Sequence, residues 1–238
     1  MKSIDGLPLD YFAGGVPFGM IFEGSSGELR KLVSNTNKEG GFLDIISEVS
    51  YIGIVSYFEA FFKNHFASII NICPELIHQL KKSGHNVFVD PTDILNAKSE
   101  FYRKLGFYIS EKYDFGTAQK VNALFVSILS ISPFSKKEKN KYDSILCDRN
   151  LLVHHGGIYT SSYSKQKFTE KSLRDKAHWG SLVISKKYYF DTADFLEKIV
   201  QKTTKSTKTA LIEFVANNEI ELNESQAQAV EFLDMSNK

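Results

Sequence analysis

The spacing of apolar and polar residues along the chain predicts a protein built mainly of helices. Apolar side chains recur at steps of three and four, the period of an α-helix, in several segments that turn signals separate. The expected helices span about residues 42–71, 93–111, 117–131, 135–155, 191–214 and 227–233. Helices with short connections between them predict an all-α fold, an antiparallel helical bundle.

The longest expected helix, about residues 42–71, is apolar on two faces. One stripe runs over residues 52–69 and a second over residues 54–61. A helix with two apolar faces is usually central in a bundle or lies at a subunit interface. We therefore expect this helix to organise the core.

Glu59 occupies one step of the first apolar stripe. Because an unpaired buried carboxylate is costly, Glu59 should have a polar partner if it is buried, and Arg149 or Asn150 would serve. The alternative is that Glu59 lies at the edge of the stripe and reaches water.

The first 41 residues form a region rich in glycine and turns. Short strands are expected around residues 11–12 and 18–22, so residues 1–41 are predicted to be an irregular or β-containing arm or a small hairpin. Its glycines are not followed by Lys-Ser/Thr and do not match a phosphate-binding loop. Residues 42–215 would form the helical domain, and residues 216–238 an acidic tail.

Charge is distributed unevenly along a chain that is almost neutral overall. The 238 residues carry a formal net charge of +1, and 42% of them are hydrophobic, as in an ordinary globular protein. Residues 135–176 hold ten basic and five acidic side chains, whereas residues 209–238 hold one basic and six acidic ones. Contact with nucleic acid would therefore need a local basic patch. Four candidates for RNA backbone contact, or else for a solvated helix start, are Lys136, Lys137, Lys139 and Lys141.

Cysteine and histidine usage argues against a disulfide framework and a metal site. Cys73 and Cys147 stand apart, without a CxxC pair, and the histidines show no HExxH pattern. We expect no metal and no cofactor. The amino terminus lacks the apolar core of a signal peptide, and no apolar run approaches the roughly 20 residues that span a bilayer. The prediction is a cytoplasmic protein without membrane contact.

The clearest candidate chemistry lies in the segment Arg149-Asn150-Leu151-Leu152-Val153-His154. It ends a helix that Ser135 and Glu138 begin as a capping box and that Gly156-Gly157 stop. Arginine offers a permanently charged planar fork, and histidine exchanges a proton near neutral pH. RNA can be cleaved without metal when its 2′-hydroxyl attacks the neighbouring phosphate, which requires a general base, a general acid and a cation.

Helical geometry limits how this segment could form a site. At roughly 100° per residue, Asn150 and His154 lie about 40° apart, whereas Arg149 and His154 lie about 140° apart. The arginine and histidine therefore converge only through the length of arginine, a distorted last turn or a second chain. A dimer with a composite site on its two-fold axis satisfies the third condition.

The motif resembles the RNxxxH form of the Arg-x4–6-His motif of HEPN domains. The upstream segment Ser56-Tyr57-Phe58-Glu59-Ala60-Phe61-Phe62 is similar to the aromatic, acid-bearing first helix of that family, and the order of elements agrees over about residues 42–215. HEPN domains are small all-helical domains, and many are metal-independent endoribonucleases.

The resemblance implies specific roles. Arg149 would stabilise the phosphate charge, His154 would act as acid or base, and Asn150 would orient the site. His155 would be a second proton carrier or a helix-end residue favoured by the dipole. Some family members carry a nucleotidylated tyrosine two residues beyond the histidine, where this chain has Gly156, so that mode of control is not expected.

The resemblance also implies RNA as substrate, a homodimer with a composite site, and a neutralising or regulatory protein partner. It predicts an effector of anti-phage defence or of a toxin–antitoxin system that leaves a 2′,3′-cyclic phosphate. Two alternatives stay open: an inactive HEPN-type module that binds RNA, nucleotide or a protein, and a structural bundle in which Arg149 and His154 merely pair and cap.

Overall fold

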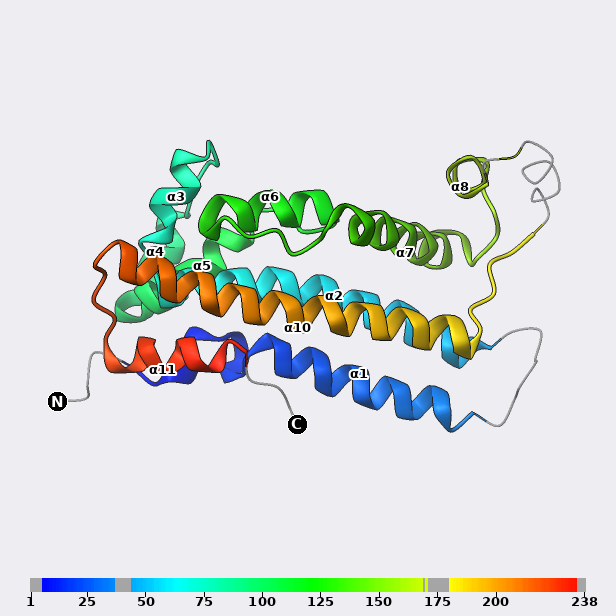
Figure 1. Ribbon diagram of the computed structural model, residues 1–238, viewed down its shortest axis with the longest axis horizontal. Coiled ribbons are helices and arrows are strands. Elements are labelled where there is room, and N and C mark those ends of the chain that lie inside the picture. The colour runs from blue at the N-terminus through cyan, green and yellow to red at the C-terminus, as the bar shows by residue number, and fades with distance from the viewer. Residues whose placement is uncertain (1–5, 37–43, 169, 171–179, 235–238) are drawn as a thin grey trace. The chain divides into compact units, whose positions relative to one another are not determined.

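The computed structural model describes residues 6–36, 44–168, 170 and 180–234. These residues form helices, turns and one isolated β-bridge, with no strand among them (Figure 1). The helices are α1 (Phe18–Ser34), α2 (Ile45–Ile72), α3 (Leu76–Lys82), α4 (Pro91–Ala97), α5 (Phe101–Ser110), α6 (Ala118–Leu129), α7 (Lys136–His155), α8 (Ser161–Lys167), α10 (Lys186–Asn217) and α11 (Glu224–Phe232), with 3-10 turns η1 (Pro8–Tyr11), η2 (Ala13–Gly15) and η3 (Lys98–Glu100). The all-α prediction is confirmed.

The chain divides into two compact units, each assembled from separate stretches of sequence. The first unit comprises Met1–Gly24, Glu59–Phe134 and Lys198–Lys238, and the second comprises Ser25–Phe58 and Ser135–Glu197. Helices α1, α2 and α10 each contribute one part to the first unit and one to the second. The sequence-based division at residues 41 and 215 stays a prediction.

The core of the first unit is aromatic. Phe62 and Phe66 of α2 pack against Phe125 of α6, with ring centroids 5.8 and 5.7 Å apart. His65 lies among these rings, is 2% exposed, and stacks on Phe61 at 5.1 Å. Burial lowers the pKa of the His65 imidazole to about 3, so the ring is neutral at physiological pH. Aromatic rings bury large apolar areas, so this cluster stabilises the unit.

Helices α2 and α5 approach each other closely at Gly106 in the first unit. The Gly106 amide donates to Asn71 Oδ1 at 2.7 Å. A Cβ atom at Gly106 would lie 2.0 Å from the Ala67 carbonyl oxygen, well inside van der Waals contact. Glycine is therefore required here because only a residue without a side chain lets the two backbones come this close.

The second unit is held by a mixture of apolar and polar contacts. Phe58 of α2 meets Tyr142 of α7 edge to face, with centroids 5.0 Å apart, and the Tyr51 hydroxyl donates to the Ile145 carbonyl at 3.0 Å. Arg30 of α1 bonds to Glu197 of α10 at 2.9 Å. Charge-assisted hydrogen bonds of this kind fix the position of the helices as well as their spacing.

The structure corrects the prediction for the amino-terminal arm. Residues 18–22, expected as a strand, begin helix α1, and residues 8–11 and 13–15 form 3-10 turns. The glycines of α1 suggested turns, but Phe22, Ser26 and Val33 are fully buried at helical spacing. Packing on one helical face outweighs the roughly 1 kcal/mol that each glycine costs in a helix. Residues 1–5 and 37–41 of the predicted arm lie outside the described residues.

Several other predicted elements also differ from the observed ones. The final long helix begins at Lys186 rather than Asp191. At this start, Ser185 Oγ accepts a hydrogen bond from the Tyr188 amide at 3.1 Å. Helix α8 lies within the predicted loop 158–180. Residues 93–111, predicted as one helix, form α4, η3 and α5. Residues 169, 171–179 and the tail residues 235–238 lie outside the described part of the chain.

Helix α2, which was expected to organise the core, also has the length and apolar composition of a membrane-spanning helix. Within the described residues, it is the one helix long and apolar enough to cross a bilayer by length and composition, whereas the sequence was expected to contain no apolar segment of that length. The core helix of a soluble protein meets the same two criteria, and 44% of the apolar window of α2 is buried. The absence of membrane contact stays a prediction.

Candidate functional site

Helix α7 positions the Arg-His motif, and its two ends are formed as the sequence predicts. Ser135 Oγ accepts from the Glu138 amide, and Glu138 Oε2 accepts from the Ser135 amide at 2.7 Å, which completes the capping box. At the other end Gly156 adopts the left-handed conformation (φ 56°) and its amide donates to the Leu152 carbonyl at 3.1 Å. The helix therefore ends sharply after His155.

The motif side chains lie at the surface of this helix end. Arg149 is half-buried and its Nη1 donates to Asn150 Oδ1 at 3.0 Å. Asn150, His154 and His155 are exposed. The two histidines occupy the last turn, where the helix dipole favours a positive charge. Asn150 and the two histidines are thus accessible to solvent, whereas Arg149 is partly covered.

The helix is regular through the motif, which narrows the ways in which Arg149 and His154 can act together. Helical backbone continues to His155, so the last turn is not distorted. At roughly 100° per residue the two side chains point about 140° apart. Two ways for the Arg149 and His154 side chains to meet therefore stay open. One is the length of the arginine side chain, and the other is a second copy of the chain.

Exposed apolar side chains flank the motif. Val153 is 47% exposed, Ile158 62% and Val183 47%. Residue 158 forms an isolated antiparallel bridge with Ser181, and the Leu182 amide donates to the Gly157 carbonyl at 2.8 Å. Side chains alternate between the two faces of such a pairing, so Ile158 and Val183 share the outward face while Leu182 is half-buried. An apolar surface beside polar catalytic candidates is typical of an interface.

A buried carboxylate lies directly behind the motif. Asp148 is 2% exposed and accepts hydrogen bonds from the hydroxyls of Tyr163 (2.8 Å) and Tyr188. Lys167 Nζ lies 2.7 Å from Asp148 Oδ1 and donates to the Ser144 carbonyl at 2.9 Å. The four side chains Asp148, Tyr163, Lys167 and Tyr188 are called the Asp148 cluster below.

The chemistry of the Asp148 cluster is that of a satisfied ion pair rather than a proton shuttle. Burial, followed by the hydrogen bond to Asp148, raises the pKa of the Tyr163 and Tyr188 hydroxyls, which therefore stay protonated and donate. Tyr188 also stacks on Tyr51, whose pKa burial raises as well. The cluster ties α7 to α8 and α10 one residue before Arg149.

Asp148 was not among the residues predicted from the sequence, although its position carries a signal. Asp148 stands three residues after Ile145 and four before Leu152, so it fills a step of the apolar stripe of α7. The same reasoning drew attention to Glu59. In the structure Glu59 is half-buried in the first unit, whereas the motif belongs to the second unit, and its pairing with Arg149 or Asn150 stays a prediction.

The predicted RNA-contacting lysines lie at the opposite end of α7 from His154. His154 stands 18 positions after Lys136, which corresponds to roughly 27 Å of helix. Lys136, Lys137 and Lys141 are exposed, and Lys139 is half-buried. Lys141 Nζ lies over the Phe195 ring, 4.5 Å from its centroid. These lysines would therefore contact a different phosphate from the one at the motif.

Metal-ligating residues do not gather in the described part of the chain. No group of three or more His, Cys, Asp or Glu side chains there could hold a metal ion. Cys73 is buried, Cys147 is half-buried, and neither forms a disulfide. Burial raises the pKa of the Cys73 thiol to about 12, so this cysteine is not a nucleophile at neutral pH.

Comparisons with known proteins add no family assignment. No protein-family model, curated protein or solved structure matches the chain.

Proposed function

We propose that the protein is a metal-independent endoribonuclease of the HEPN type. The observation that carries this proposal is that Asn150 and His154 are exposed at the end of α7 and that the half-buried Arg149 is joined to Asn150 by a hydrogen bond. A permanent cation and an imidazole can supply the charge stabilisation and the proton transfer that metal-independent RNA cleavage needs, and the amide of Asn150 can orient them. The resemblance of the motif to HEPN domains favours a cytoplasmic effector of anti-phage defence or of a toxin–antitoxin system.

The proposed reaction is an attack of the RNA 2′-hydroxyl on the adjacent phosphorus. His154 accepts the hydroxyl proton as the new O–P bond forms. The bond to the 5′-oxygen breaks, and that oxygen takes a proton from an acid, either the His154 of a second copy or water. Arg149 stabilises the charge on the phosphorane oxygens. The products are a 2′,3′-cyclic phosphate and a free 5′-hydroxyl.

A second copy of the chain would complete the site. Arg149 and His154 point about 140° apart on one regular helix, so a two-fold pair of α7 ends would bring each arginine towards the histidine of the other copy. The exposed Val153, Ile158 and Val183 would be covered in such a pair. The Asp148 cluster supports this arrangement because it holds α7 rigidly behind the motif, and preorganised groups stabilise a transition state best.

The test is RNA cleavage in EDTA by the purified full chain, beside Arg149→Ala and His154→Ala. His78→Ala is the matched control, because His78 is also exposed on a helix and lies in the first unit. We expect cleavage by the wild type and the control, with losses of about 10²-fold or more in the two motif variants. The products should carry a cyclic phosphate.

Other outcomes would decide between the alternatives. Retention of RNA without cleavage would overturn the enzyme and favour the binding module. If the wild type ignores RNA and both motif variants lose stability, the arginine and histidine are structural. Sedimentation of the wild type and of Ile158→Glu would test the second copy, since we expect the charged side chain to abolish both dimerisation and cleavage.

A further inference from the structure

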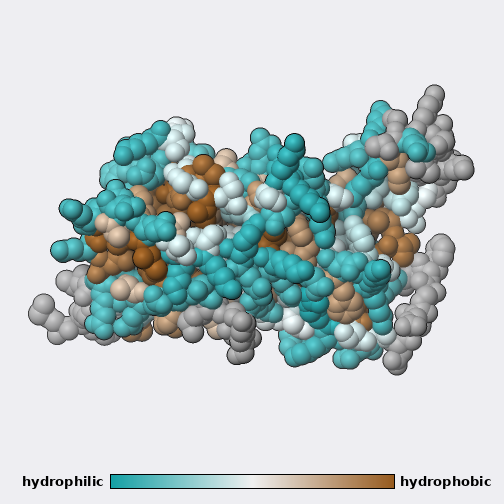
Figure 2. All heavy atoms as spheres, viewed as in Figure 1, coloured by the Kyte–Doolittle hydropathy of each residue, from teal (hydrophilic) through white to brown (hydrophobic). Residues whose placement is uncertain are grey.

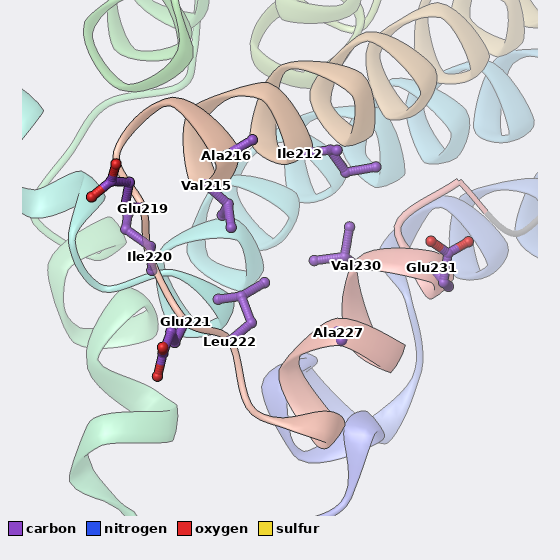
Figure 3. A pocket seen from close by; sticks show the side chains of 10 residues that line it. All are labelled: Ile212, Val215, Ala216, Glu219, Ile220, Glu221, Leu222, Ala227, Val230 and Glu231. Carbon is purple, nitrogen blue, oxygen red and sulfur yellow. The ribbon is translucent and has the colours of Figure 1, made fainter.

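The first unit contains an apolar pocket at the end of α10, remote in sequence from the Arg-His motif. Its volume is about 640 Å³, and it lies between the last turns of α10, the connecting loop 218–223 and α11. Figure 3 shows Val215, Leu222 and Val230 pointing toward one another across the hollow, with Ile212 beside them. Ile212 is 48% exposed, so part of this apolar lining faces solvent.

Carboxylates stand at the edge of this pocket. Glu219, Glu221 and Glu231 belong to its lining, and Figure 3 shows them at its periphery. Residues 217–234 hold five acidic side chains and no basic one. Lys208 of α10 lies near one side, 2.8 Å from Glu231 and 3.0 Å from Asp234, whereas the exposed Glu219 and Glu221 stand on the loop. The pocket is apolar inside and negatively charged around its mouth.

The walls of the pocket are fixed by polar bonds that do not line it. Asn223 and Gln226 form a capping box at the start of α11, and Gln226 Nε2 also donates to the Ile72 carbonyl at 2.8 Å. The Ser225 hydroxyl donates to the Gly6 carbonyl at 2.8 Å. Because α11 is anchored in this way, the pocket is preformed, and a ligand need not order it on binding.

The combination of shape and charge selects the kind of occupant. An apolar interior excludes a purely ionic ligand, since the desolvated charge would have no partner inside. The surrounding carboxylates repel polyanions such as RNA and an anionic membrane surface. A ligand with apolar side chains flanked by lysine or arginine would fill the apolar interior and pair with the carboxylates at the edge. The nine residues of α11 extend roughly 13 Å, which matches about two turns of a partner helix.

We propose that this pocket, called the α10–α11 pocket, docks a basic amphipathic helix of a partner protein. Apolar side chains four residues apart would enter between Ile212, Leu222 and Val230, and flanking cations would face Glu219 and Glu221. This is the helix-in-groove mode of recognition. The surface is distinct from the Arg-His motif, so the proposal goes beyond the proposed function and does not depend on it.

The experiment is a selection of displayed peptides of about 16 residues on the full-length wild-type protein. We expect the enriched peptides to carry apolar residues at i and i+4 flanked by lysine or arginine. Enrichment of acidic or uncharged peptides, or of none, would overturn the proposal. Binding of a synthetic enriched peptide should weaken as salt rises, because opposite charges steer the association.

Two variants with matched controls then locate the binding. Ala227→Trp fills the pocket, and its control Gln228→Trp puts the same ring at the next, exposed position of α11, outside the lining. Glu219→Gln with Glu221→Gln removes two edge charges, and its control removes Glu213 and Glu224, which are outside the lining. We expect about 30-fold weaker peptide binding for the filled pocket and about tenfold for the edge pair, with the controls unchanged.

Thermal unfolding of each variant tests whether it folds. If Ala227→Trp does not fold, the double variant Glu219→Gln with Glu221→Gln still tests the site. Equal binding to the wild type and both pocket variants would refute the site. Sedimentation of the protein alone tests the competing occupant: self-association that Ala227→Trp abolishes would mean that a second copy fills the pocket. RNA cleavage should be unchanged in all four variants. A wrong docking proposal can therefore be distinguished from a wrong nuclease proposal.

Discussion

The two units each bury an ionisable side chain to 2% exposure, but they do so in opposite ways. In the first unit His65 sits between the rings of Phe61 and Phe125 and is kept neutral, since burial lowers its pKa to about 3. In the second unit Asp148 receives two tyrosine hydroxyls and the ammonium of Lys167.

The difference teaches how each unit tolerates change. A neutral imidazole among aromatic rings behaves as part of an apolar core, and it destabilises the fold only when it must take up a proton. An ion pair with hydrogen bonds on every side depends on all of its members, because removing one leaves others buried without compensation. The second unit, which carries the Arg-His motif, is therefore the more sensitive to substitution and the first unit the more sensitive to acid.

Among single substitutions measured at neutral pH, the largest effect is expected from Asp148→Asn. The amide keeps the shape but removes the charge that Lys167 faces, so we expect a loss of about 3 kcal/mol in the free energy of unfolding. Asp191→Asn, an exposed aspartate of the same unit, should change it by less than about 0.5 kcal/mol. Urea denaturation measures both. Equal effects of the two substitutions would show that Asp148 contributes no more to the free energy of unfolding than an exposed aspartate does.

Acid should act on the first unit through His65. The folded pKa is about 3 and the unfolded one about 6.5, so below pH 6.5 the unfolded chain binds a proton that the folded chain does not. Stability conferred by the neutral ring is complete above pH 6.5 and falls by up to about 1.4 kcal/mol per pH unit down to pH 3. His65→Phe, or His65→Leu where the larger ring does not fit, should flatten this dependence, as urea denaturation between pH 7 and pH 4 will show.

Gly106→Ala should disrupt the packing of α5 on α2 in the first unit. The new Cβ would fall 2.0 Å from the Ala67 oxygen and 2.9 Å from Asn71 Oδ1, so the helices must move apart. We expect a loss of about 1 to 3 kcal/mol, measured by urea denaturation. Hydrogen exchange should show reduced protection in α5 while α7 keeps its own. Loss of protection in α7 alone would contradict the assignment of this contact to the first unit.

The smallest effect, and one of opposite sign, is expected for Gly27→Ala in the second unit. Gly27 lies within α1, and a Cβ there would have no heavy atom within 4 Å. Alanine should stabilise the helix by about 0.5 to 1 kcal/mol because it restricts the unfolded chain and favours helix. Thermal unfolding measures the gain. A destabilised variant would show that α1 needs the glycine for packing.

The sequence predicted best those elements whose local signals agreed with their packing. Helix α7 begins at the Ser135–Glu138 capping box and ends at Gly156 as expected, and α6 begins after the Thr117 cap. Apolar periodicity located α2 to within a few residues of its observed end. Caps and periodicity are local properties, so they can be interpreted without knowing what packs against the helix.

Prediction failed where a tertiary partner decided the outcome. Helix α1 contains Gly19, Gly24 and Gly27, which locally favour turns. Its buried face and the bonds from Ser26 and Arg30 to Glu197, 167 or more residues away, favour the helix instead. The Asp148 cluster joins residues from α7, α8 and α10, so only its apolar-stripe position was visible beforehand. The α10–α11 pocket likewise depends on how α11 is anchored at Ile72 and Gly6.

By itself the sequence determined the all-α class, the limits of α7 and the chemistry of Arg149, Asn150 and His154, because helix periodicity, caps and side-chain type are local. Only the tertiary structure decided that Asn150 and His154 are exposed while Arg149 is half-buried, that of Asp148 and Glu59 it is Asp148 that is fully buried, and that α10 and α11 enclose an apolar hollow. Burial depends on what covers a side chain, and residues distant in sequence provide that cover.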